Sequence, residues 1–169
     1  MKILVIGGTG NIGLPLIQYL DQQVGVQVVA GAHNLHKDEQ LLAAYSDVEI
    51  RRFDFLDETT FDAALRGIQK VFFVRPPQLA KPKQDMWPFL KCLQAHHIEQ
   101  VVFVSLMGVE HNPMTPHHQI EQMIEQLQLP YTFIRPSFFM QNLNTTHRVR
   151  HSAKSRFVYP SRAVEDEFY

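Results

Sequence analysis

Cysteine is nearly absent from this chain of 169 residues, which bears on both redox chemistry and location. The one cysteine, Cys92, cannot form an internal disulfide, and we interpret it as a small apolar core residue rather than a nucleophile. Long apolar runs are absent too, since none approaches the ~20 residues that cross a bilayer. The apolar run at 3–6 is short and ends in glycines, so it indicates a strand rather than a signal peptide. We expect a cytoplasmic protein without a membrane partner.

An excess of one charge sign is also missing. The chain has 16 Lys and Arg against 17 Asp and Glu, a net charge of −1, so no long-range attraction to nucleic acid is expected. The basic bias at 148–156 lacks interleaved aromatic residues, and we interpret it as a solvated face. With 45% hydrophobic and 20% charged residues, the composition is that of a globular domain.

Apolar strand-like runs alternate with helix-length segments along the chain. We predict strands at 3–6, 26–30, 48–53, 71–74, 101–105 and 131–134, and helices at 11–23, 38–44, 59–66, 84–96, 117–127 and 138–151. Pro88 falls inside one predicted helix, near its start or at a kink. Six such repeats predict an α/β fold: a Rossmann-like, doubly wound parallel sheet with helices on both faces and strand order 3-2-1-4-5-6.

A glycine-rich loop at residues 7–13 gives the strongest chemical signal. It follows an apolar strand and opens an amphipathic helix, which is the context that the dinucleotide fingerprint requires. Gly7 permits the tight turn, a Cβ at Gly10 would obstruct a phosphate, and Gly13 permits close packing of helix on strand. The helix N-terminus would bind a pyrophosphate. A glycine-rich turn without a ligand is the alternative.

The cofactor is better described as NADP than as NAD. An NAD site usually has a carboxylate at the end of the second strand, and this chain has none there. His33 and Lys37 instead bring positive charge toward a 2′-phosphate, although both also suit a solvated loop. Asp54 and Phe55 are placed to meet an adenine; the alternative is a turn aspartate and a core phenylalanine.

Several further motifs resemble one family. They are Phe-Asp-Phe at 53–55, Val-Arg-Pro-Pro at 74–77, Val-Ser-Leu-Met-Gly-Val at 104–109, Pro-His-His-Gln-Ile-Glu at 116–121 and Tyr-Thr-Phe-Ile-Arg-Pro-Ser-Phe-Phe-Met-Gln-Asn at 131–142. Together with the glycine loop they resemble the NmrA-like NAD(P)-binding proteins, atypical short-chain dehydrogenases, over about residues 1–158. Some members of that family reduce quinones or dyes with NAD(P)H, and others are redox-sensing regulators without turnover.

The resemblance implies a set of cofactor contacts. The pyrophosphate would meet Gly7, Thr9, Gly10, Asn11, Ile12 and Gly13, and the adenine ribose would lie over Val74, Arg75 and Pro76. Ser105 would lie near the nicotinamide, which Pro136, Phe138 and Phe139 would flank. His33 stands where many members carry a phosphate-binding arginine, and Lys37 fits the basic position that follows.

The Tyr-x-x-x-Lys pair of short-chain dehydrogenases is missing. Counting back from Glu121 puts His118 at the lysine position and Met114 at the tyrosine position. His118 would bond the nicotinamide ribose or donate a proton, or else is a solvated residue near the helix N-terminus, and we assign the catalytic role to His118 and Ser105. His117 is expected at the surface. Hydride transfer to a quinone does not require a protein acid, so a reductase remains compatible with this sequence. No histidine spacing fits a known metal motif, and we expect no metal.

The end of the chain departs from the family pattern. Family members continue well beyond this length, so we expect the C-terminal lobe to be largely missing and the uncovered apolar surface to promote a homodimer or aggregation. With suitable codons, a shifted frame through residues 161–169 encodes Ala-Gly-Gln-Trp-Lys-Thr-Ser-Phe, which restores the family pattern. We therefore divide the chain into a Rossmann domain, 1–158, and an atypical, out-of-frame tail, 159–169; sequencing the gene there tests this.

Three functions follow from these observations. The first is an NAD(P)H-dependent reductase of a quinone-like or other small acceptor. The second is a dinucleotide-sensing regulator that binds a protein partner without turnover, and the third is an inactive truncated remnant.

Overall fold

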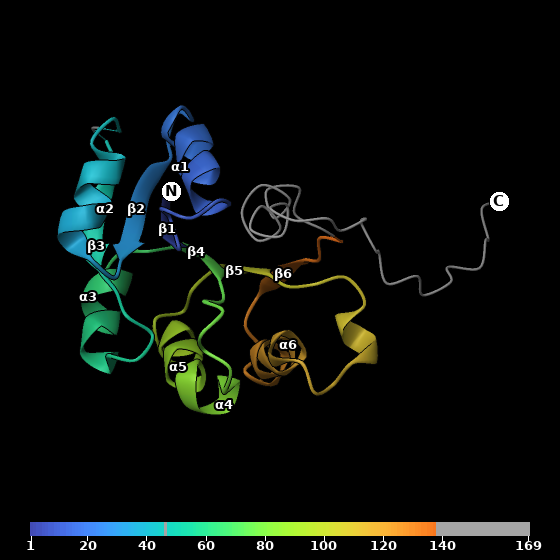
Figure 1. The fold of residues 1–169 in the computed structure, drawn as a ribbon. Coiled ribbons are helices and arrows are strands. Elements are labelled where there is room, and N and C mark those ends of the chain that lie inside the picture. The colour runs from blue at the N-terminus through green and yellow to red at the C-terminus, as the bar shows by residue number, and fades with distance from the viewer. Residues whose placement is uncertain (46, 138–169) are drawn as a thin grey trace, which may run out of the picture. The chain divides into compact units, whose positions relative to one another are not determined.

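A computed structural model describes residues 1–45 and 47–137 of the chain (Figure 1). The strands are β1 (Lys2–Ile6), β2 (Gln27–Ala32), β3 (Glu49–Arg52), β4 (Lys70–Val74), β5 (Gln100–Val104) and β6 (Tyr131–Ile134). The helices are α1 (Gly13–Asp21), α2 (Leu35–Leu42), α3 (Phe61–Leu65), α4 (Pro82–Asp85), α5 (Trp87–Ala95) and α6 (Pro116–Gln126), with short 3-10 turns η1 (Glu58–Thr60) and η2 (Val109–His111).

The six strands form one parallel sheet in the order β3-β2-β1-β4-β5-β6. This confirms the predicted α/β class and the predicted strand order. The order reverses between β1 and β4, because β1 pairs with β2 on one side and with β4 on the other. Ligands of doubly wound folds bind at the carboxyl ends of the strands beside such a reversal, and the glycine loop follows β1 there.

The two faces of the sheet are covered by different helices, as Figure 1 shows: α1 and α2 on one face, and α3, α5 and α6 on the other. The second face holds the main core, in which Phe89 of α5 is fully buried. Its ring lies 5.0 Å from that of Phe53, 5.2 Å from Phe55 and 5.4 Å from Phe61, all edge-on. Such edge-to-face pairs each contribute about 0.5–1.5 kcal/mol beyond the area they bury.

Element boundaries differ from the sequence predictions where local chemistry intervenes. The predicted helix 84–96 is two helices, α4 and α5, separated at Met86, because Pro88 lacks an N–H and is accommodated only in the first turn of α5. The predicted helix 38–44 begins earlier, at Leu35, because the Asn34 side chain caps it by accepting from the Lys37 amide at 3.1 Å.

Residues 1–137 form one compact unit. The predicted helix 138–151, the boundary at residue 158 and the tail lie outside the described residues. No helix of the described residues is long and apolar enough to cross a membrane.

Candidate functional site

The glycine loop turns tightly from β1 into α1. Gly7 has a φ of +80°, which only glycine adopts at low cost, and its carbonyl accepts from the Gly10 amide at 3.0 Å. At Gly13 an ideal Cβ would lie 2.2 Å from the Gly7 oxygen and 2.7 Å from the Gly8 Cα. No side chain fits between the helix and the loop there, so the close approach of α1 to β1 requires glycine.

The start of α1 offers free amide groups. Within residues 1–45 and 47–137, the N–H groups of Asn11, Ile12 and Gly13 donate no hydrogen bond, and the first turn of α1 carries no acidic side chain. Free N–H groups and the positive end of the helix dipole together attract an anion. These residues therefore fit the pyrophosphate of a dinucleotide.

A buried carboxylate fixes the loop to the next helix. Thr9 Oγ1 donates to Asp38 Oδ1 at 3.0 Å, and the Asn34 amide donates to Asp38 Oδ2 at 3.4 Å. Asp38 is buried, although it belongs to a helix with polar neighbours. The hydroxyl of Thr9 thus holds the loop, while the role of Thr9 as a cofactor ligand stays a prediction. The sequence analysis missed Asp38, because its partners come from outside its own helix.

The residues predicted for the adenosine end lie beyond β2 and β3. His33 Nδ1 and Asp54 Oδ2 are 3.3 Å apart, and the His33 side chain is 78% exposed. Asp54 also accepts from the Leu56 amide at 2.9 Å, which makes it a turn residue as well. Lys37 is exposed on the first turn of α2. The structure therefore brings His33 and Asp54 together, with Lys37 on the adjoining helix.

Phe55 lies in the core. It is 5% exposed, and its ring packs edge-on against Phe53 and Phe89. This placement agrees with the core-phenylalanine alternative, and it leaves the ring little surface on which an adenine could stack. Its assignment as an adenine contact stays a prediction.

Polar groups without described partners lie at the carboxyl ends of β4 and β5. The register pairs Val74 with Val104, which places Arg75 and Ser105 at the same edge of the sheet. The buried hydroxyl of Ser105 has no hydrogen-bond partner among the described residues, and neither has the buried Nε atom of Arg75. Buried polar atoms are normally hydrogen-bonded, so each such group requires an explanation.

Arg75 also shapes the loop that follows it. Its guanidinium donates to the carbonyl oxygens of Pro76 at 3.0 Å, Pro77 at 3.2 Å and Leu79 at 2.8 Å. Burial lowers its pKa. Val74, just before it, lies 3.9 Å from an ideal Cβ at Gly7, so the loop after β4 adjoins the glycine loop. The structure therefore brings four of the predicted cofactor residues close together: Gly7, Val74, Arg75 and Pro76.

His117 points into the molecule, so the expectation that it lies at the surface is wrong. Its ring stacks on Phe103 of β5, with centroids 5.9 Å apart and planes 21° from parallel. Burial, together with the positive charge of Arg75, lowers its pKa to about 4, so it is neutral at pH 7. The helical repeat places residue 117 one turn before Glu121, which is also buried, and this spacing was the available signal.

His118, the predicted catalytic histidine, is held near the N-terminus of α6. Its Nδ1 lies 3.0 Å from the Val109 carbonyl oxygen, which only accepts, so Nδ1 carries the proton. In the neutral ring, Nε2 is then an acceptor. The His118 amide donates to Thr115 Oγ1 at 3.3 Å, which caps the helix. The catalytic role of His118 stays a prediction.

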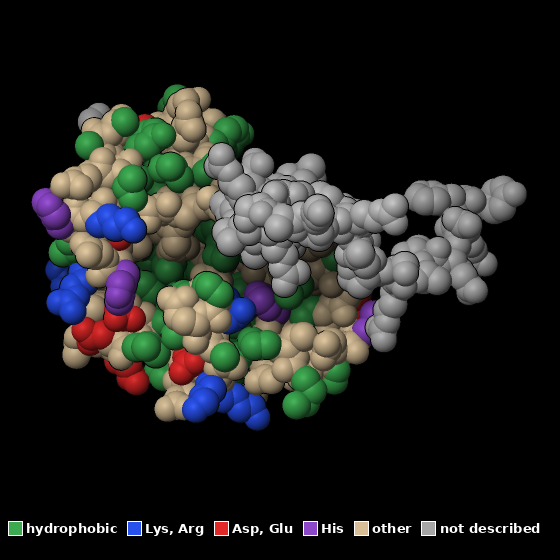
Figure 2. All heavy atoms as spheres, viewed as in Figure 1, with side chains coloured by type: hydrophobic (Ala, Val, Ile, Leu, Met, Phe, Trp, Pro, Cys, Tyr) green, Lys and Arg blue, Asp and Glu red, His purple; other side chains and the backbone are tan. Residues whose placement is uncertain are grey.

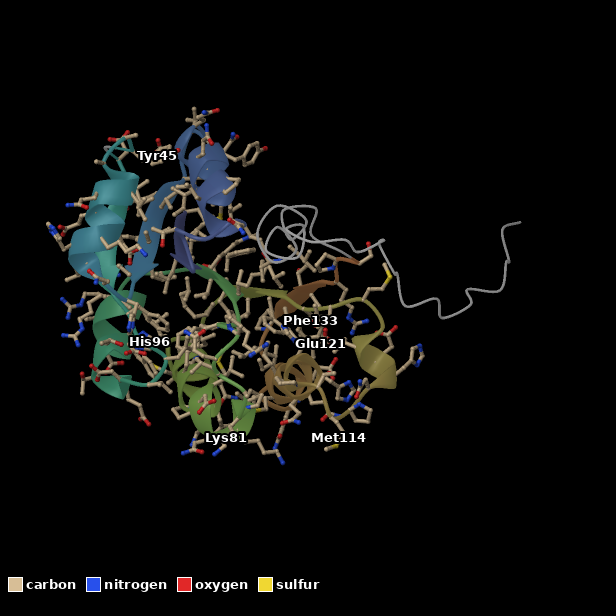
Figure 3. All side chains as sticks on the ribbon, viewed as in Figure 1. Tyr45, Lys81, His96, Met114, Glu121 and Phe133 are labelled. Carbon is tan, nitrogen blue, oxygen red and sulfur yellow. The ribbon has the colours of Figure 1, made fainter. Side chains whose placement is uncertain are left out.

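Glu121 and Arg135 fix α6 against β6. Arg135 donates through Nε to Glu121 Oε1 at 3.0 Å and through a terminal nitrogen to Oε2 at 2.7 Å. Figure 3 labels Glu121 on α6 and Phe133 on β6, the strand that Arg135 follows. Pro136, which follows, accepts from the Met107 amide at 3.2 Å, whereas Phe138 and Phe139 lie outside the described residues.

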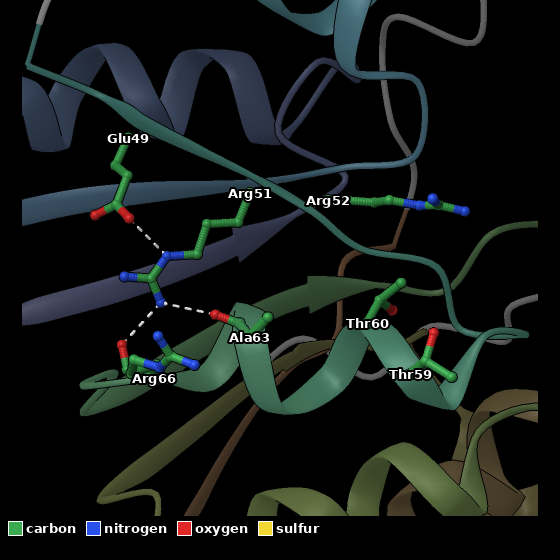
Figure 4. Close-up of a pocket in the computed structure, with 7 residues that line it drawn as sticks. All are labelled: Glu49, Arg51, Arg52, Thr59, Thr60, Ala63 and Arg66. Atoms are coloured by element: carbon green, nitrogen blue, oxygen red, sulfur yellow. Dashed lines mark hydrogen bonds and ion pairs between the residues drawn. The ribbon is translucent and has the colours of Figure 1, made fainter.

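A depression of about 560 Å³ lies between β3 and α3, and none of the predicted cofactor residues lines it (Figure 4). Charged side chains of both signs gather over these elements (Figure 2). Arg51 donates to the carbonyl oxygens of Ala64 at 2.9 Å and Arg66 at 2.8 Å and pairs with Glu49 at 2.7 Å. Arg51 thus caps the end of α3, and this pocket has a structural explanation.

Comparisons with known proteins agree with this geometry. A family model described as NAD(P)H-binding matches residues 7–164. Prestalk A differentiation protein A of Dictyostelium discoideum is 30% identical over 145 residues, covering 85% of this chain and 47% of that protein. NAD(P)H azoreductase of Xenophilus azovorans is 30% identical over 149 residues, covering 83% and 49%. The chain spans about half the length of these curated relatives.

Solved structures share the fold. The NADPH-dependent quinone oxidoreductase QOR2 of Escherichia coli, complexed with NADPH, superposes with a TM-score of 0.75 at 22% identity, covering 87% of this chain and 53% of that one. NmrA, a negative transcriptional regulator in complex with NADP, superposes with a TM-score of 0.67 at 22% identity, covering 79% and 44%. Both show the same fold as the described part of this chain.

Proposed function

The chain belongs to the NAD(P)H-binding family, and on this premise we propose that it is an NAD(P)H-dependent reductase of a quinone-like or other small acceptor. One observation supports this most strongly: a glycine loop whose amides at the start of α1 donate to no group of the described residues, beside a sheet edge with buried polar groups that also lack described partners. The azoreductase and quinone oxidoreductase among the similar proteins add support for the acceptor class.

The pyrophosphate would lie on the amides of Asn11, Ile12 and Gly13. These N–H groups donate no hydrogen bond within the described residues, so binding a pyrophosphate breaks no hydrogen bond in that part of the chain. A side chain at Gly13 would displace the helix, and a Cβ at Gly10 would project beside the Gly7 oxygen at 3.3 Å. Thr9, held by Asp38, keeps the loop in the binding conformation before the cofactor arrives.

The adenosine end would meet His33, Lys37 and Asp54, and the cofactor would be NADP in preference to NAD. Lys37 is an exposed cation that a 2′-phosphate can approach. His33 lies against the Asp54 carboxylate, so this aspartate would either bond the adenine amino group or hold His33 toward the phosphate. The basic side chains of His33 and Lys37 support the choice of NADP, whereas Asp54 would serve the adenine that both cofactors share.

The nicotinamide end would lie at the carboxyl ends of β4 and β5. When bound, the reduced nicotinamide supplies a hydride; the protein holds donor and acceptor in contact. The buried Ser105 hydroxyl would gain a hydrogen-bond partner in the carboxamide or ribose. Neutral His117 and the loop of Arg75 would wall this region, and His118 would offer Nε2 to the ribose or, when protonated, a proton to the reduced acceptor.

Turnover of NADPH with a panel of quinones and azo dyes tests the proposal. We expect NADPH loss that depends on an acceptor, and a lower kcat/KM in His118→Gln. His111→Gln is the matched control, because His111 is an exposed histidine paired only with Glu110 at 3.6 Å among the described residues. Equal activity in His118→Gln and the native chain would contradict the role of His118, and absence of acceptor-dependent turnover would contradict the reductase.

A dinucleotide-sensing regulator is the second candidate. Met114 and His118 occupy the positions of the usual Tyr and Lys, and Met114 is 83% exposed on the loop before α6. NmrA, a negative transcriptional regulator, has a similar fold and binds NADP. Saturable NADPH binding without turnover of any acceptor in the panel would favour this candidate over the reductase.

A further inference from the structure

Three side chains with metal-binding atoms meet between α3 and α5, on the side of the sheet opposite α1. They are Asp62 of α3, Cys92 of α5 and His96 at the end of α5. Figure 3 shows His96 between the two helices. Cys92 and His96 are four residues apart, so a helical turn presents both on one face, and Asp62 faces them from the neighbouring helix.

The distances suit one small cation. Asp62 Oδ1 lies 2.8 Å from His96 Nε2 and 3.7 Å from Cys92 Sγ, and all three atoms lie within 4.8 Å of one another. In a tetrahedral zinc site, with bonds of about 2.0–2.3 Å, ligand atoms are separated by about 3.3–3.6 Å. The three atoms therefore reach this geometry through side-chain movements of about 1 Å.

The chemistry and charge of the cluster also favour a cation. Thiolate, imidazole and carboxylate are the ligand types of zinc. Burial, and then the negative charge of Asp62, raise the pKa of the Cys92 thiol to about 11, so a metal ion would have to displace the thiol proton at pH 7. The Asp62 side chain is 86% exposed and that of His96 29%, which gives an ion and a fourth, water ligand access.

We propose that Asp62, Cys92 and His96 form a binding site for a zinc-class divalent ion, separate from the dinucleotide site. The site would clamp α3 to α5 beneath the aromatic core, and its function would be structural or regulatory rather than hydride transfer. The sequence analysis expected no metal because the third ligand comes from a different helix, 30 residues away from Cys92.

Cobalt(II) titration of the full, untagged chain tests this proposal. Because Cys92 is the only cysteine, a sulfur-to-cobalt charge-transfer band can arise from no other thiolate. We expect this band with one equivalent of cobalt, together with intense visible d–d bands of tetrahedral cobalt, and we expect zinc to displace it. Cys92→Ser should abolish the band, and Asp62→Asn and His96→Gln should each weaken cobalt binding by more than ~10-fold.

His97→Asn is the control, since His97 is exposed beside the cluster and has a φ of 51°, which asparagine tolerates. It should bind cobalt as the native chain does, and circular dichroism should show every variant folded. Absence of the charge-transfer band at millimolar cobalt would overturn the proposal. A band that Asp62→Asn and His96→Gln leave unchanged would also overturn it, because it would report a lone thiolate adduct.

Discussion

Replacement of Gly13 by alanine should damage both the fold and cofactor binding. The new Cβ would lie 2.2, 2.7 and 2.8 Å from three backbone atoms of Gly7 and Gly8. None of these atoms belongs to a flexible side chain, so α1 must move by about 1 Å to restore ordinary van der Waals contact. Overpacking of this kind costs about 3 kcal/mol at the upper end of its range, and the better helix propensity of alanine offsets about 1 kcal/mol.

The net loss of about 2 kcal/mol corresponds to a fall of about 4–8 °C in the melting temperature for a chain of this size. The amides of Asn11 and Ile12 move with the helix, so NADPH affinity should fall by more than ~10-fold. Differential scanning calorimetry and a fluorescence titration measure the two effects.

Gly10→Ala is the matched control for Gly13→Ala. Its Cβ would meet only the Gly7 oxygen, at 3.3 Å, so the backbone needs to adjust by a few tenths of an ångström. We therefore expect a small change in melting temperature together with a large loss of NADPH affinity. An unchanged melting temperature in Gly13→Ala, or unimpaired NADPH binding by both variants, would refute the assignment of this loop.

Other predictions concern an arginine cap, a half-buried histidine and the cofactor choice. Arg51→Ala removes three hydrogen bonds to carbonyl groups in and just after the last turn of α3, together with the pair with Glu49, and should cost about 2 kcal/mol in urea denaturation. Arg52→Ala, the control, removes a side chain that is 67% exposed and should leave the midpoint unchanged; equal effects would contradict the capping role. The folded-state pKa of His117, about 4, lies below its unfolded value of 6.5, so stability is complete above pH 6.5 and is lost as the pH falls toward 4. Because the ring is only partly buried, we expect the free energy of unfolding to fall by about 2 kcal/mol over this pH range, and we expect His117→Phe to abolish that fall. If His117→Phe lost stability in acid as the native chain does, His117 would not be its cause. Lys37→Ala should weaken NADPH binding about three- to five-fold and leave NADH binding unchanged; a parallel loss for both nucleotides would argue against a 2′-phosphate contact.

The order of the strands and the tight turn of the glycine loop could both be predicted from the sequence. The inner strands β1, β2, β4 and β5 are largely buried and read as short apolar runs, so their alternation with helices leads directly to a doubly wound parallel sheet. The glycine loop is local in sequence, and its strand–turn–helix context is therefore visible without a structure. Pro88 marks the break before α5 for the same reason, since its effect is confined to its own turn.

Contacts between elements account for what the sequence analysis missed. His117 stacks on Phe103, and the charge of Arg75 helps to lower its pKa; both residues lie far from His117 in the sequence. The polar partners of Asp38 lie in the glycine loop and at Asn34, and nothing in the pattern of α2 marks it as buried. A spacing rule reads one segment at a time, whereas these arrangements arise when separate segments pack together.

The position of a residue in a sequence motif suggests a role for it, but it does not show where the side chain packs. The position of Phe55 just after the third predicted strand suggested an adenine contact, while packing against Phe53 and Phe89 puts its ring in the core. The roles of Ser105 and His118 stay predictions, although the buried, unpartnered hydroxyl of Ser105 among the described residues gives that prediction a physical reason.

Titration of the purified chain with NADPH and, side by side, with NADH tests the central claim most directly. The amides at the start of α1 donate no hydrogen bond within residues 1–45 and 47–137. Together with the basic side chains beyond β2, they predict saturable binding of one nucleotide per chain, with NADPH clearly tighter than NADH. Failure of the folded chain to bind either nucleotide at millimolar concentration would contradict the account.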